Sequence, residues 1–347
     1  MAVPIDRDGA TFGEGIVNLA SKRDFKRTYL ERIVSLIPVP YYWGWQLIAL
    51  AFLAVSSICL TLFEGSIEHL DFFLILSAII AMEGSAINWA HIKLHSLAGI
   101  VINIIELPKE TIIRSCESWE AEIFSDKRMI SFAMIFLIFV HAIGIDYHDL
   151  SFNSGISVAV FNLGYYFAVF LEGAGFYVMV MTALTMSKIG RQPLKIDSLF
   201  SDFHAIGILY SKFTIYAASV YIIWGLFHMI VPPLFSSLQL ILWFSGFAVL
   251  LFAYFILPQY RIHRMMGSAK RERIEMLSNQ MRAALDASSG APAGDNEAYI
   301  RDMLTMQNQL NQMSEWPFGT QEMLRIGLII IIPLIIIILE IALGILK

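Results

Sequence analysis

Residues 71–91 read DFFLILSAIIAMEGSAINWAH, an apolar run whose interior holds a single acid, Glu83. A helix needs about 20 mostly apolar residues to cross the hydrocarbon core of a membrane. Because backbone polar groups cannot stay unpaired in lipid, such a run must be helical. Six further runs have this character, so we predict an all-α polytopic membrane protein with seven transmembrane helices, at 43–63, 71–91, 129–148, 156–186, 208–231, 234–257 and 326–346.

The composition excludes a soluble globular protein. The chain has 347 residues, of which 57% are hydrophobic and 15% are charged. A soluble domain carries about 25% charged residues. The two cysteines, Cys59 and Cys116, fall at different predicted levels of the membrane, so we expect them to be packing residues rather than a disulfide.

Basic residues set the predicted orientation. When the seven spans alternate, 23 of the 24 Lys and Arg residues lie on one side and only Lys347 lies on the other. Lys and Arg are retained on the cytoplasmic side during insertion. We therefore predict a multi-pass protein of the plasma (inner) membrane, with the N-terminus in the cytoplasm and the C-terminus outside.

The spans divide the chain into four parts. Residues 1–40 form a cytoplasmic N-terminus with an amphipathic interfacial helix, and residues 41–257 form a six-helix bundle with a cytoplasmic loop at 92–128. Residues 258–325 form a cytoplasmic helical hairpin, and 326–347 form the final span. The arms of the hairpin carry apolar stripes that need a partner, either each other or neighbouring subunits, at Ile274, Leu277, Met281 and Leu285, and at Met303, Met306, Leu310 and Met313.

Two acids lie deep inside predicted spans, Glu83 and Glu172, and each is followed by small residues. Both spans run from outside to inside, so the two carboxylates are expected at similar depth. Ionisable groups in a membrane are costly and often functional. One interpretation is a carboxylate pair that binds a cation or a proton. The other is that each carboxylate bonds a neighbouring Tyr, Ser or His and fixes the packing.

Histidines and sequence motifs give no enzyme signature. His141 and His228 are candidates for buried ionisable residues, although a single His in a bundle is usually a hydrogen-bonded core residue. His91 and His95 share one helix face, but a membrane di-iron site needs several such pairs. Nucleotide-binding, hydrolase and zinc-protease motifs are absent from the sequence. We predict no enzymatic activity, no cofactor, no metal and no nucleic-acid partner.

The last span is almost purely aliphatic around Pro333 and ends near Glu340. If subunits surround an axis, Ile332 and Ile336 form an apolar constriction, Pro333 permits bending and Glu340 forms an acidic ring. Acidic rings select cations, and apolar constrictions gate by dewetting. The alternative is a lipid-facing anchor with Glu340 at the headgroups.

The plan of seven spans, a cytoplasmic N-terminus and long cytoplasmic helices before the last span resembles insect odorant and gustatory receptor channels. In that family the helices before the last span assemble a tetramer, and the last span lines a cation pore. The resemblance covers the whole chain as topology, while the family's Thr-Tyr and Gln-Phe signature is not present in the last span.

This plan predicts an oligomeric cation channel that assembles through the cytoplasmic hairpin, with the lipid bilayer, cations and further copies of the chain as partners. One alternative is a proton- or cation-coupled secondary transporter that uses the midplane carboxylates. A second alternative is a membrane sensor or scaffold that acts through the hairpin.

Overall fold

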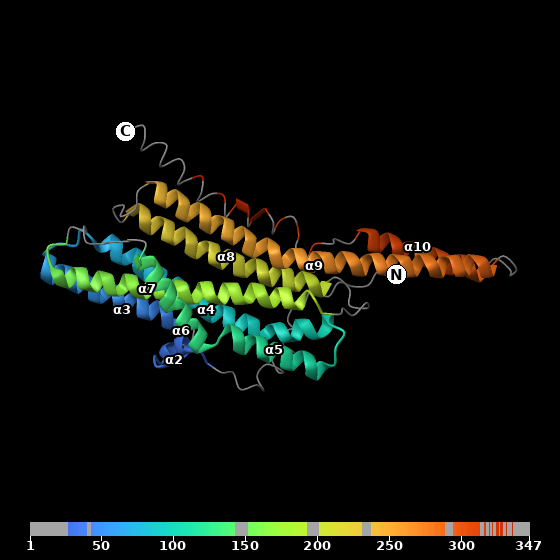
Figure 1. Ribbon diagram of the computed structural model, residues 1–347, viewed down its shortest axis with the longest axis horizontal. Coiled ribbons are helices and arrows are strands. Elements are labelled where there is room, and N and C mark those ends of the chain that lie inside the picture. The colour runs from blue at the N-terminus through green and yellow to red at the C-terminus, as the bar shows by residue number, and fades with distance from the viewer. Residues whose placement is uncertain are drawn as a thin grey trace.

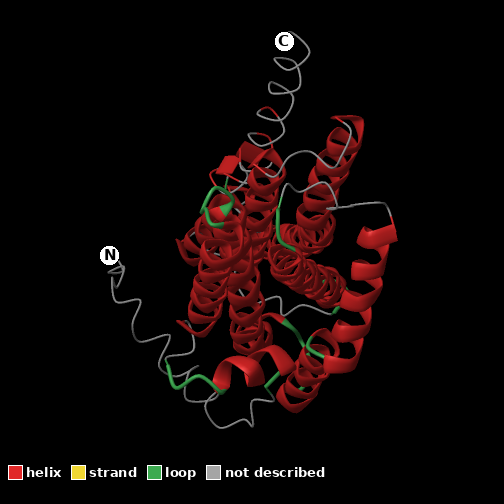
Figure 2. Ribbon diagram, turned by 90° about the vertical axis from the view of Figure 1, so that its left-hand side faces the viewer, coloured by secondary structure: helices red, strands yellow, loops and turns green. Residues whose placement is uncertain are grey.

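Helices make up the regular structure of the described chain (Figures 1 and 2). This computed structural model describes residues 27–39, 43–142, 152–192, 201–230, 237–288 and 294–312, and scattered residues between 316 and 335. The helices in chain order are α2 (Tyr29–Ser35), α3 (Gly44–Cys59), the π-helical turn η2 (Leu60–Glu64), α4 (Leu70–Ile104), α5 (Lys109–Ile123), α6 (Asp126–Ala142), α7 (Gly155–Ile189), α8 (Ser201–Ile230), α9 (Ser237–Ser288) and α10 (Gly294–Gln312).

Five of the described helices are long and apolar enough to cross a membrane. They are Gly44–Glu64, Leu70–Ile104, Gly155–Ile189, Ala205–Phe227 and Ser245–Asp286, and each overlaps a predicted span. The predicted span at 129–148 is represented by α6, which covers 17 residues up to Ala142. Most of 326–346 lies outside the described residues. The structure therefore supports a membrane protein, and the seven-span topology stays a prediction.

Helix α4 is the centre of the bundle and packs against α3, α5, α7 and α8. Its 35 residues measure about 52 Å at 1.5 Å per residue, against a hydrocarbon core of about 30 Å. Both α4 and α7 are therefore longer than one crossing requires. In Figure 1 their C-terminal ends lie with α5 toward the end of the bundle from which α9 and α10 project. This is the end that the sequence predicts to be cytoplasmic.

Glycines directly after Glu83 and Glu172 let the helices approach closely. A Cβ atom at Gly84 would lie 2.1 Å from the ring of Trp45 on α3, and one at Gly173 would lie 2.9 Å from the Cα atom of Ala133 on α6. Real Cβ atoms do not come this close to other heavy atoms. The small residues after Glu83 and Glu172 thus allow the tight helix contacts that are typical of membrane bundles.

Pro258 does not end its helix. Helix α9 runs unbroken from Ser237 to Ser288, so the boundary predicted between the bundle and the hairpin falls inside it. Proline has no N–H group, and it frees the carbonyl four residues earlier, which is Tyr254. The hydroxyl of Tyr210 on α8 donates a hydrogen bond to that carbonyl oxygen at 2.8 Å. This bond from a neighbouring helix replaces the missing one, and the helix continues.

Replacing Tyr210 with Phe is expected to lower stability, because the Tyr254 carbonyl then loses its partner inside the bundle. The cost is about 1–3 kcal/mol for a buried acceptor, or roughly 4 °C in the apparent Tm. In a Pro258→Ala background the alanine N–H bonds Tyr254 within the helix, so Tyr210→Phe should cost much less. Thermal unfolding in detergent measures both losses, and equal losses in the two backgrounds would contradict this role.

Helices α9 and α10 form a hairpin that extends past the bundle (Figure 1). Leu277, Met303 and Leu310 are buried between the arms, with Ile274 and Met281 packed against them. The Lys270 ammonium donates to the carbonyl oxygen of Asn311 at 3.1 Å. The predicted stripes thus meet each other over part of their length. Two further members, Leu285 and Met306, are exposed, and Met313 lies outside the described residues.

Candidate functional site

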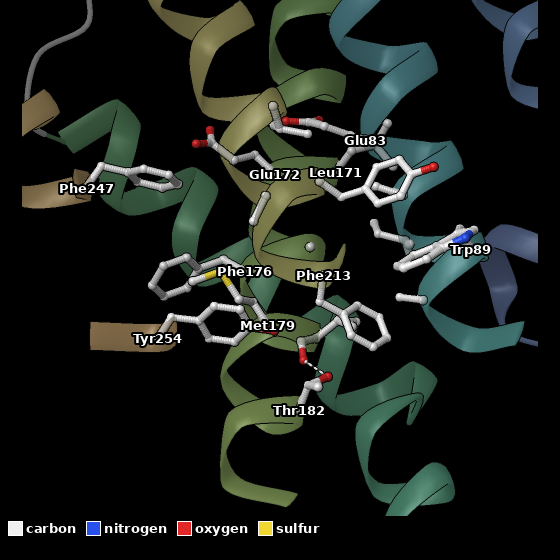
Figure 3. Close-up of a pocket in the computed structure, with 18 residues that line it drawn as sticks. Glu83, Trp89, Leu171, Glu172, Phe176, Met179, Thr182, Phe213, Phe247 and Tyr254 are labelled. Carbon is white, nitrogen blue, oxygen red and sulfur yellow. Dashed lines mark hydrogen bonds between the residues drawn. The ribbon is translucent and has the colours of Figure 1, made fainter. Parts of the chain in front are cut away.

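Glu83 of α4 and Glu172 of α7 line the same cavity inside the bundle (Figure 3). Side chains from α8 and α9 complete its wall, so residues of four helices line it. The cavity measures about 90 Å³, which is room for several water molecules. In Figure 3 the two glutamates lie near one end of the cavity and Thr182 lies at the other. The two acids that sequence analysis placed at similar depth are therefore brought to one site.

Glu83 is the more deeply buried of the two acids, with 3% of its surface exposed. Its Oε1 atom accepts a hydrogen bond from the Trp224 indole at 2.8 Å. Its Oε2 atom is buried and has no hydrogen-bond partner among the described residues. A buried carboxylate oxygen without a partner is costly. A proton bound to this oxygen, or a cation that reaches it from the cavity, would supply the missing partner.

Glu172 is partly buried, and its charge acts on Glu83. At an effective dielectric constant of about 20, two unit charges separated by about 4–8 Å repel each other by roughly 2–4 kcal/mol. The described side chains that line the cavity include no Lys, Arg or His. The described lining thus supplies no positive charge at this site. Two ionised carboxylates would need a cation between them, and otherwise one of them must carry a proton.

The rest of the cavity wall is apolar and strongly aromatic. Among the described residues, six aromatic side chains line it, namely Trp89, Phe176, Phe213, Tyr216, Phe247 and Tyr254. Nothing in the sequence marks them as residues of a site. Each lies in an apolar run where aromatic residues are common, and only the packing of α4, α7, α8 and α9 brings them together.

The remaining predicted site residues do not join this cavity in the described structure. His141 was predicted to be buried, and this is wrong. It occupies the last turn of α6 and is exposed, with its ring edge-on to Tyr166 at 6.1 Å, because it lies on the outer side of the bundle. Outside the described part lie the side chain of His228 and the predicted pore residues Ile332, Pro333, Ile336 and Glu340.

A second polar cluster joins α2, α4 and α5, and we name it the His–Glu network. Its members are Glu31, His91, His95 and Glu120. His91 Nδ1 lies 2.8 Å from Glu31 Oε1, and His91 Nε2 lies 3.3 Å from Glu120 Oε1. His95 Nδ1 lies 2.9 Å from Glu120 Oε2. Since both nitrogens of His91 face carboxylate oxygens, the geometry suits a doubly protonated imidazole.

The His–Glu network explains why two imidazoles share one face of α4. The spacing of His91 and His95 is visible in the sequence, but their partners Glu31 and Glu120 were not predicted. One local signal was present for Glu31, because Thr28-x-x-Glu31 forms a capping box at the start of α2. No local signal marks Glu120, which reaches His91 and His95 only after α5 packs on α4. No group of His, Cys, Asp and Glu in the described chain is arranged to hold a metal ion.

Glu120 makes the stability that the His–Glu network contributes depend on pH. Burial favours a higher pKa for its carboxyl, but hydrogen bonds from His91 and His95 outweigh burial and hold the pKa of Glu120 below its ordinary value. A lowered pKa in the folded state adds stability above the ordinary pKa of about 4.3, and this stability is lost as the pH falls through the lowered value.

Glu120→Gln should therefore lower the apparent Tm at pH 7 by about 4 °C and flatten the loss of stability below pH 5. Thermal unfolding in detergent from pH 7 to pH 3.5 measures both effects. Glu110→Gln is the matched control, since Glu110 is exposed on the same helix. If the apparent Tm of Glu120→Gln falls below pH 5 as steeply as that of the wild type, Glu120 is not the source of the acid-dependent loss of stability.

Comparisons with protein families, with curated proteins and with solved structures give no match to this chain.

Proposed function

We propose that this protein is a secondary transporter in which Glu83 and Glu172 exchange a proton for a cation. One observation carries the proposal: Glu83 Oε2 is buried and has no partner among the described residues, and it belongs to a side chain that lines the same cavity as Glu172. Of the functions that the sequence predicts, coupled transport is the one that needs such a site. The helix that would line a channel lies largely outside the described residues.

Competition between a proton and a cation follows from the charges at the site. The described residues of the cavity wall supply two acids and no base. A cation that enters reduces the repulsion between the carboxylates, so both can be ionised and the shared proton leaves. When the cation leaves, a proton returns. If the cavity opens to one side of the membrane at a time, this competition couples the movement of the proton to that of the cation.

The test uses proteoliposomes that hold the full-length protein, an acidic lumen and a trapped pH-sensitive dye. Na⁺, K⁺ and tetramethylammonium, which do not cross lipid as neutral species, are added outside in separate runs. We expect at least one of them to raise the luminal pH at a rate that saturates with concentration. Glu172→Gln should reduce this rate by about 100-fold or more, the scale of losing a positioned proton-transfer group.

Glu110→Gln serves as the matched control and should behave as the wild type. Flux that grows linearly with concentration and survives in Glu172→Gln would contradict the transporter. That result would instead favour the oligomeric cation channel, whose proposed pore residues are distant from Glu172 in the sequence.

A further inference from the structure

We infer that the cation at the Glu83–Glu172 cavity is a compact organic ammonium ion, one that carries methyl or other small alkyl groups. This inference rests on the proposed transport function and goes further by naming the class of substrate. It combines two properties of one cavity, which are acidic groups near one end and aromatic side chains along the wall.

The acidic end supplies the charge. Glu83 Oε2 is buried without a hydrogen-bond partner in the described structure, and Glu172 lies near the same end of the cavity. A positive ligand satisfies the first carboxylate and removes its repulsion with the second. An anion is disfavoured, because the described lining has no basic side chain to meet it.

The aromatic wall supplies the second half of the recognition. Trp89 contacts Phe213 edge-on with ring centroids 5.0 Å apart, and it contacts Tyr216 with ring centroids 4.5 Å apart. Phe247 enters the cavity wall from α9. Aromatic faces attract cations, and methylated ammonium ions are well suited because they carry little bound water. These rings also contact the alkyl groups that surround the nitrogen.

Inorganic cations suit this wall less well. A desolvated metal ion takes about six or more oxygen ligands. Beyond the two carboxylates, the side-chain oxygens of the described lining are the hydroxyls of Thr182, Tyr216 and Tyr254. Thr182 lies at the far end of the cavity and donates its hydrogen to the Val178 carbonyl at 2.7 Å. The oxygens are too few and too dispersed to replace a hydration shell, whereas an alkylammonium ion does not need them.

The volume limits the size of the ligand. A cavity of about 90 Å³ is smaller than the engineered cavity of about 150 Å³ that holds benzene. An ammonium group with a few carbons is therefore the appropriate scale, and tetramethylammonium, which is about as bulky as benzene, enters only when side chains of the wall move.

The experiment measures equilibrium binding of radiolabelled tetramethylammonium to the purified full-length protein in detergent. We expect saturable binding at pH 8 that weakens at pH 5.5, where protons compete for the carboxylates. Glu83→Gln and Glu172→Gln should abolish it, and Na⁺ or K⁺ at equal concentration should not displace the probe. Gln at position 83 still offers an acceptor to Trp224, so the fold has reason to persist.

Phenylalanine variants test the aromatic wall. Phe213→Leu and Phe247→Leu keep an apolar side chain but remove the ring, and each should weaken binding by about tenfold. Phe252→Leu is the matched control, because Phe252 is exposed on α9 and should leave binding unchanged. Wild-type affinity in both wall variants would overturn the recognition by aromatic rings.

The two proposals fail in different ways. If Na⁺ or K⁺ is exchanged for protons in proteoliposomes but tetramethylammonium neither binds nor is exchanged, the substrate class is wrong and the transporter stands. If tetramethylammonium binds as expected but no cation drives proton movement, the binding site stands and the transport function is wrong.

Discussion

Gly173→Val is expected to lower the apparent Tm by about 10 °C, since it forces α6 and α7 apart. A Cβ atom at this position would lie 2.9 Å from the backbone of Ala133 and 2.9 Å from the Cβ atom of Phe136. Neither atom is the far end of a flexible side chain, so the helices themselves must move. Overpacking of this kind costs about 3 kcal/mol, and a protein of this size loses roughly 2–4 °C per kcal/mol.

Gly246→Val is the matched control for this prediction. Gly246 is exposed on α9, and a Cβ atom there meets no atom within 4 Å. The same substitution should therefore leave the apparent Tm unchanged or slightly raised. Thermal unfolding in detergent, monitored as the fraction of protein that stays monodisperse, measures the apparent Tm of both variants. Equal stability of the two valine variants would contradict the close contact of α6 and α7 beside Glu172.

His91→Ala has the second large expected effect. It removes the imidazole that lies between Glu31, which is 1% exposed, and Glu120. Breaking a buried ion pair by removing one partner costs about 3–5 kcal/mol, because the remaining charge stays desolvated. We expect the apparent Tm to fall by roughly 10 °C. Because Glu31 belongs to α2, this helix should also loosen from the bundle, and trypsin should cleave faster at Arg32.

His95→Ala provides the graded comparison for the His–Glu network. His95 is 12% exposed and contacts Glu120 from the rim of the network, so its loss should cost less than half as much. The double variant His91→Leu with Glu31→Gln removes both members of the buried pair and should recover part of the loss. A His91→Ala protein as stable as His95→Ala would show that the network contributes little to the attachment of α2.

Sequence patterns predicted the helices of this fold well, because a long apolar run that crosses lipid must form an α-helix to pair its backbone polar groups. The carboxylate pair was predictable in part. Glu83 and Glu172 stand out as acids in apolar runs, and equal depth follows from counting residues. That they share a cavity depends on which faces of α4 and α7 meet, and no periodicity in either helix specifies this.

Other features depend on contacts between distant parts of the chain. Pro258 predicts a helix end, yet the helix continues. The Tyr210 hydroxyl, 48 positions earlier in the chain, donates the hydrogen bond that the Tyr254 carbonyl would otherwise lack. Glu120 looks like an ordinary surface acid of an amphipathic helix, and only packing of α5 on α4 brings it to His91. For His141 the sequence predicted burial and the side chain is exposed. An apolar sequence around a residue does not show whether its side chain points into the bundle or away from it.

The central claim is that Glu83 and Glu172 form one site where a proton and a cation compete, and carbodiimide labelling tests it most directly. Dicyclohexylcarbodiimide reacts with a protonated carboxyl and leaves a stable adduct where water is excluded. Mass spectrometry should find the adduct on Glu172 or Glu83 in membranes at pH 6, with less at pH 8 and less again when the exchanged cation is present. The account would be contradicted if neither residue carried the adduct, or if the amount of adduct changed neither with pH nor with the cation.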